Sequence, residues 1–125
     1  MEQIGRRIWA IAEGHIPSRS VNEEHALISH EAACFLNATN EVAEVALTLF
    51  FTDREPAGPY RVRVPARRTL HLRFNDLTDP EPVPRDTDYA TLIASSVPIV
   101  VPYTRQDTRH PAIALISTIA FASDC

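Results

Sequence analysis

The stretch Ala43-Glu44-Val45-Ala46-Leu47-Thr48-Leu49-Phe50-Phe51 decides the fold class. Its odd positions carry apolar side chains, Glu44 and Thr48 stand between them, and Thr52 follows the stretch. Successive side chains of a strand point to opposite faces, so a period of two gives one apolar and one polar face. The pattern predicts a β-strand with one face in a protein core.

Two shorter runs with the same period follow. The first covers Tyr60 to Val64, the second covers Thr69 to Asn75, and only residues 65–68 separate them. Two alternating runs joined by a short turn are typical of a β-hairpin. In paired strands we expect the intervening polar side chains to share one surface, formed by Arg61, Arg63, Thr69, His71, Arg73 and Asn75. That surface suits an anionic or polyhydroxylated ligand, and it equally suits the solvent face of a sheet.

The remaining segments rich in branched residues are also short. With the runs above they make seven or eight predicted strands, which is typical of an antiparallel sandwich or barrel; they are residues 8–13, 27–36, 89–94, 97–103 and 113–121. Pro98 and Pro102 remove backbone donors on one side of their strand, so we expect an edge strand or a bulge there. Residues 89–94 and 112–122 also fit helices, and strands are the favoured interpretation.

Composition bounds the size and class of the protein. The chain has 125 residues and a net charge of −4, and all twelve basic residues are arginine. A chain of this length typically buries about two-thirds of its unfolded surface, so we expect one domain over residues 1–125. No stretch approaches the roughly 20 apolar residues that span a bilayer. The apolar segment near the N-terminus is too short for a signal peptide, and we therefore expect a cytoplasmic protein.

Catalytic and metal-binding motifs are not evident. Cys34 and Cys125 offer neither a disulfide framework nor a ligand spacing. The five histidines also lack a ligand spacing, so no metal, cofactor or catalytic residue is predicted, and a cupin-like metal enzyme that uses His30 or His71 is the first alternative. The acidic balance argues against a dedicated nucleic-acid binder. The arginines between Arg61 and Arg73 leave a DNA-binding regulator as the second alternative.

A second polar group surrounds Trp9, the only tryptophan. An indole close to Glu13 and His30 fits the stacking and hydrogen bonding of a sugar site. A lone tryptophan in a small domain equally fits the core, and His30 fits a buried histidine bonded to the backbone. Glu31 points to the opposite face of its strand, so it does not form a local acid–base pair with His30.

Short sequence motifs along nearly the whole chain resemble those of the Anabaena sensory rhodopsin transducer family. They occur in the same order as in the family, and they are Trp9-Ala10-Ile11-Ala12-Glu13-Gly14, Ile28-Ser29-His30-Glu31, Asp53-Arg54-Glu55-Pro56, Gly58-Pro59-Tyr60-Arg61, Val64-Pro65-Ala66-Arg67-Arg68-Thr69, Arg73-Phe74-Asn75-Asp76-Leu77, Asp86-Thr87-Asp88, Val97-Pro98-Ile99-Val100-Val101 and Thr104-Arg105.

The resemblance implies an all-β fold, a jelly-roll-like antiparallel β-sandwich that assembles as a homotetramer. It also implies signal reception from a membrane photoreceptor of the rhodopsin type, a small-molecule pocket with carbohydrate as a candidate ligand, and contact with DNA. A subset of the matching polar residues is expected to line that pocket: Trp9, Glu13, His30, Glu31, Arg73, Asn75, Asp76 and Arg105. The leading hypothesis is a non-enzymatic transducer that binds a small polar ligand and relays its state.

Overall fold

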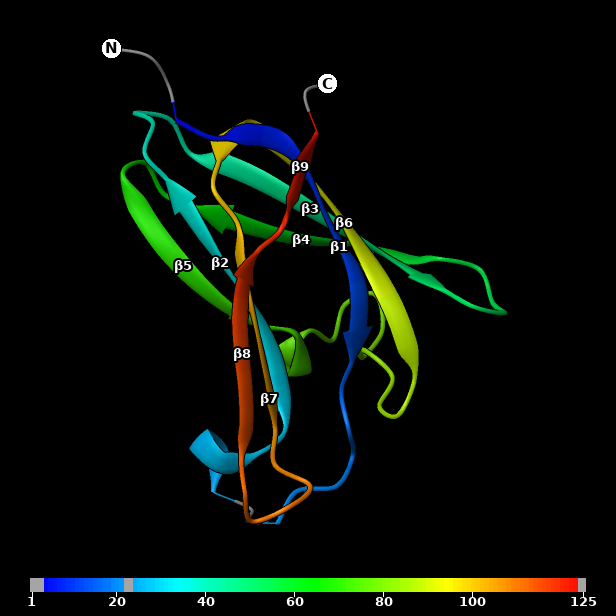
Figure 1. Ribbon diagram of the computed structural model, residues 1–125. Helices are drawn as coiled ribbons and strands as arrows, with labels where there is room; N and C mark the ends of the chain where they lie inside the picture. The colour runs from blue at the N-terminus through cyan, green and yellow to red at the C-terminus, as the bar shows by residue number, and fades with distance from the viewer. Residues whose placement is uncertain (1–3, 22–23, 124–125) are drawn as a thin grey trace.

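Two antiparallel β-sheets pack face to face in the computed structural model, which describes residues 4–21 and 24–123 (Figure 1). The first sheet has the order β4-β3-β6-β1-β9, with bounds Ala57–Val64, Ala43–Phe51, Asp88–Ile99, Arg6–His15 and Phe121–Ser123. The second has the order β5-β2-β7-β8, with bounds Arg68–Arg73, His30–Asn37, Pro102–Asp107 and Ala114–Ile119. The predicted β-sandwich is confirmed, with nine strands in the described part of the chain.

The core lies between the sheets and follows the predicted alternation. On β3, Val45, Leu47 and Leu49 are almost fully buried, and Phe35 of β2 packs against them from the other sheet. Burying one large apolar side chain stabilises a fold by about 1.5–3 kcal/mol, so this shared layer holds the sheets together. Two 3₁₀ turns, η1 (His25–Leu27) and η2 (Phe74–Asp76), are the helical elements of the described residues, and neither has the length to cross a membrane.

The predicted hairpin of residues 60–75 is wrong. β4 pairs with β3 and β5 pairs with β2, so the two runs belong to opposite sheets. The corner between them is held by Asn37, whose side-chain amide donates to the carbonyls of Val64 and Pro65. Each run needs its apolar face in the core, and the core has two sides. Consequently Arg61 and His71 lie on different outer faces, and the expected single polar surface does not form.

The segment 97–103 also divides between the sheets. β6 runs through Pro98 and lies between β3 and β1, so it is not an edge strand. The other expectation for the prolines is met, because residues 95–98 lie opposite the single residue Arg7 in a bulge. β7 begins at Pro102 in the second sheet.

Strands, not helices, form over residues 89–94 and 112–122, as favoured from the sequence. The second segment divides at Ala120, whose amide donates to the carbonyl of Val101. β8 forms the edge of the second sheet and β9 forms the edge of the first, so the chain crosses from one sheet to the other (Figure 1). This crossing places β8 and β9 along one open side of the sandwich, where the pocket described next is found.

Candidate ligand-binding site

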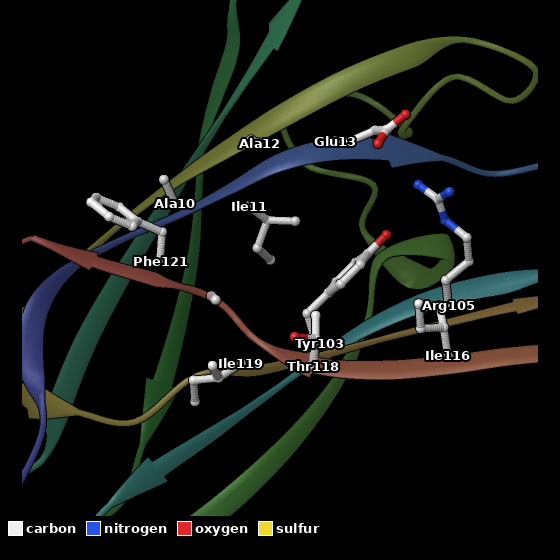
Figure 2. Close-up of a pocket in the computed structure, with 11 residues that line it drawn as sticks. Ala10, Ile11, Ala12, Glu13, Tyr103, Arg105, Ile116, Thr118, Ile119 and Phe121 are labelled. Carbon is white, nitrogen blue, oxygen red and sulfur yellow. The ribbon is translucent and has the colours of Figure 1, made fainter.

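A pocket of about 290 Å³ opens where β1 and β9 of the first sheet face β7 and β8 of the second (Figure 2). Polar groups gather at one end of it, and apolar side chains line the other end. The complete lining is Ala10, Ile11, Ala12, Glu13, Tyr103, Arg105, Ile116, Thr118, Ile119, Ala120 and Phe121. The pocket therefore offers both hydrogen-bonding groups and an apolar wall.

A β-bulge in β1 brings Glu13 to the pocket. Ile11 pairs with Thr91 and Gly14 pairs with Tyr89, so Ala12 and Glu13 together face one residue of β6. The extra residue of a bulge re-aims the neighbouring side chains. As a result the exposed carboxylate of Glu13 lies at the polar end of the pocket, across from Arg105.

Behind the pocket wall, Glu31 is fully buried and accepts three hydrogen bonds. Its carboxylate receives Arg105 Nε at 2.7 Å, the backbone amide of His15 at 2.8 Å and the hydroxyl of Tyr89. A buried carboxylate is tolerated when donors of this kind satisfy it. Glu31 thereby fixes the guanidinium of Arg105 at the pocket.

The close approach of Tyr89 to Glu31 depends on Gly14. A Cβ atom at this position would lie 2.6 Å from Tyr89 Cζ and 2.9 Å from Glu31 Oε1. Real Cβ atoms essentially never approach heavy atoms within 3.0 Å. The absence of a side chain at Gly14 is thus a requirement of the buried network.

Tyr103 supplies the polar group of the pocket that is left unpaired. Its side chain is 7% exposed, and its hydroxyl makes no hydrogen bond of acceptable geometry with residues 4–21 and 24–123, although Glu31 and Arg105 both lie close enough to influence it. Burial, and next the negative charge of Glu31, raise the pKa of Tyr103, so the phenol stays neutral. Figure 2 shows this hydroxyl aimed at the polar end of the pocket, near Glu13 and Arg105. A buried hydroxyl without a partner costs about 1–3 kcal/mol, and a ligand atom bound there would recover it.

The eight residues proposed from the sequence fall into three groups. Glu13 and Arg105 line the pocket. Glu31 lies behind Arg105, and the side-chain oxygen of Asn75 accepts the Glu31 amide at 3.3 Å while its nitrogen donates to the Ser29 carbonyl at 3.0 Å. The structure places the other four outside the pocket wall: Trp9, His30, Arg73 and Asp76.

Those four residues have other surroundings. Trp9 is 5% exposed in the core and donates from Nε1 to the Arg6 carbonyl at 2.9 Å. Arg73 lies 2.9 Å from His30 Nδ1 and also contacts His25. Asp76 is exposed in η2. Trp9 therefore lies in the core and His30 is a buried histidine, which are the alternatives to ligand contact that the sequence also offered.

Sequence reasoning missed Tyr103, Tyr89 and Gly14. Tyr103 stands two residues before Arg105, and this spacing puts both side chains on the same face of β7. The spacing was therefore a signal in the sequence that could have identified Tyr103. The contact between Gly14 and Tyr89 had no local signal because it joins distant strands.

Metal ligands do not gather in the part of the chain that the structure describes. No three His, Cys, Asp or Glu side chains of residues 4–21 and 24–123 are placed to hold one ion. His71 contacts the thiol of Cys34 at 2.9 Å, and His30 contacts Arg73. Within the described residues, the pair of His71 and Cys34 is therefore not joined by a third side chain of these types.

The comparisons with known proteins point to one family. The family described as Anabaena sensory rhodopsin transducer matches residues 4–122. The structure of the Anabaena sensory rhodopsin transducer is 57% identical, with a TM-score of 0.77, and the match covers 86% of this chain and 94% of that chain. The structure of Thermotoga maritima 1070 is 29% identical over 98% of both chains, with a TM-score of 0.86. A search of curated proteins gave no match.

The family match covers almost all described strands, and the identity to a solved member is well above the level at which folds alone are shared. Both findings agree with the resemblance that the short motifs of the sequence indicated. The chain therefore belongs to the Anabaena sensory rhodopsin transducer family.

Proposed function

We propose that this protein is a soluble, cytoplasmic signal transducer that binds a small polar ligand between its two sheets and relays the bound state to a partner. Membership of a transducer family supports the relay and a non-enzymatic role. The name of the 57% identical relative supports a membrane photoreceptor of the rhodopsin type as one source of the signal. Co-purification with rhodopsin-containing membranes tests that partner.

The observation that carries ligand binding is the buried, unpaired hydroxyl of Tyr103 in the pocket. A hydroxyl donates and accepts hydrogen bonds, Arg105 donates and Glu13 accepts. A carbohydrate complements this set because each of its hydroxyls can also do both. The volume of about 290 Å³ is at the lower end of ligand pockets, which suits a monosaccharide.

The proposed roles of the matched residues differ. Glu13 and Arg105 contact the ligand, and Glu31 and Asn75 position Arg105. This is the subset of the sequence-derived residues that the pocket supports.

Calorimetric titration with a panel of monosaccharides tests this proposal. Tyr103→Phe keeps the ring and removes the unpaired hydroxyl, so we expect an affinity loss of about tenfold, since a hydrogen bond contributes about 1 kcal/mol or more. Tyr60→Phe is the matched control, because its hydroxyl donates to the Glu81 carbonyl outside the pocket. Equal affinities of Tyr103→Phe and the parent would refute the site, and an absence of sugar binding would refute carbohydrate as the ligand.

A homotetramer is part of the proposal. Every residue of the edge strand β8 is exposed, and its apolar side chains extend to Phe121, which is 73% exposed. An exposed edge strand offers unpaired backbone groups to another chain, and a large exposed apolar patch marks an interaction surface. Light scattering should give four copies for the parent and fewer for Leu115→Glu, whereas a monomeric parent would contradict the assembly.

The two alternative functions have less support. Arg61 and Arg63 lie in the first sheet and Arg73 lies in the second, so the arginines between them do not form one DNA-binding face. A metal-dependent enzyme would need ligands that the described residues do not bring together. DNA binding that weakens steeply with salt would restore the DNA-binding alternative.

A further inference from the structure

The polar end of the pocket contains one positive and one negative side chain that face each other. Figure 2 shows the guanidinium of Arg105 and the carboxylate of Glu13 on either side of the space above the Tyr103 hydroxyl. The two groups do not form an ion pair with each other, although both belong to the pocket wall. A ligand placed there would contact both.

The positive charge of Arg105 is already balanced. Glu31 is fully buried and lies 2.7 Å from Arg105 Nε, which is the geometry of a charge-assisted hydrogen bond. A ligand anion at Arg105 would therefore also feel the carboxylate directly behind it. Arg105 retains its terminal nitrogens as donors, and it does not provide a net positive site.

The charge of Glu13 is not balanced in the same way. Within residues 4–21 and 24–123 its carboxylate has no ion-pair partner, and the bulge in β1 holds it at the pocket. The three charged groups of this end, Glu13, Glu31 and Arg105, therefore add up to one net negative charge. The neutral phenol of Tyr103 leaves that sum unchanged.

We propose that Glu13 determines ligand specificity: it accepts a hydrogen bond from a hydroxyl or ammonium group, and the pocket selects neutral or amine-bearing sugars over acidic ones. This inference rests on the proposed carbohydrate site and adds the charge class of its ligand. Like charges brought together repel each other most strongly when they are desolvated, and less where one of them stays exposed, as Glu13 does.

The test uses sets of three sugars that differ in charge alone at one position: a hexose, its 2-amino derivative and its uronic acid, in the gluco, galacto and manno series. In the series that binds the parent protein, calorimetry should give the uronic acid an affinity about tenfold or more below that of the neutral sugar. The amino sugar should bind at least as well as the neutral one. Equal affinity for the uronic acid and the neutral sugar would overturn the proposed selection against acidic sugars, and the carbohydrate site itself would remain supported.

Glu13→Gln tests the named residue, since it keeps an acceptor oxygen and removes the charge. It should raise the affinity for the uronic acid about tenfold and change that for the neutral sugar by only about two- to threefold. Glu41→Gln is the control; Glu41 is an exposed residue just before β3, and the strand register puts it at the opposite end of the first sheet. If both variants keep the parent's preference, Glu13 does not determine specificity. If no series binds the parent protein, the carbohydrate site itself is refuted.

Discussion

Replacement of Gly14 by alanine should destabilise the protein, although glycine-to-alanine changes often do the opposite. At a compatible position, alanine stabilises a fold by about 0.4–1 kcal/mol because it restricts the unfolded chain. The backbone at Gly14 does not have a positive φ, so alanine meets no backbone strain there. The sign of the effect is therefore set by what the added methyl group contacts.

That methyl group would lie 2.6 Å from Cζ and 2.7 Å from Cε2 of Tyr89, and 2.9 Å from Glu31 Oε1. Overpacking of this kind costs about 1–3 kcal/mol. A displaced Tyr89 would also lose its hydrogen bond to the buried carboxylate, and hydrogen bonds to charged groups contribute about 1.5–3 kcal/mol. With the gain from alanine subtracted, the expected loss is about 2–5 kcal/mol of the free energy of unfolding.

Urea denaturation of Gly14→Ala and the parent, followed by circular dichroism, measures this loss. Tyr89→Leu removes both clashing ring atoms, so Gly14→Ala should cost less in that background, by about 0.5–3 kcal/mol of coupling. A Gly14→Ala protein as stable as the parent would refute the steric argument. So would a cost that is identical in both backgrounds.

Two further predictions concern titratable and reactive groups of the second sheet. Burial, and next Arg73, lower the pKa of His30 from 6.5, so on acidification the unfolded chain binds a proton at a higher pH than the folded protein does. The free energy of unfolding should therefore have its full value above pH 6.5 and decrease below it. Unfolding measured at pH 7.5 and 5.5 should show a smaller difference for His30→Gln, and an unchanged difference would contradict this cause. Burial also raises the pKa of the Cys34 thiol, so its alkylation by iodoacetamide at pH 7.5 should be slower than that of free cysteine; an equal rate in a Cys125→Ser variant would contradict it.

The alternation of residues 43–51 predicted the strand, the buried face and the fold class correctly because a period of two reports directly which face is apolar. The same pattern in residues 60–75 predicted both strands correctly, and it wrongly paired them with each other. Alternation does not record which strand lies alongside, and here the short turn joins two sheets.

The candidate site shows the same limit. Glu31, Asn75 and Arg105 were found through the resemblance, and the structure joins them in one network. Tyr103 was missed because a tyrosine at the start of a strand is ordinary. Its hydroxyl becomes informative only when the three-dimensional fold leaves it buried without a partner.

The carbon resonances of the tyrosine rings provide the most direct test of the pocket. The chain contains only three tyrosines, so protein labelled with carbon-13 at the ring Cζ alone gives three signals that single Tyr→Phe variants assign. During titration with monosaccharides, the Tyr103 signal should move with a saturating dependence on ligand concentration, while that of Tyr60 should stay in place. A Tyr103 signal that remains unchanged throughout the titrations would contradict a ligand site between the two sheets.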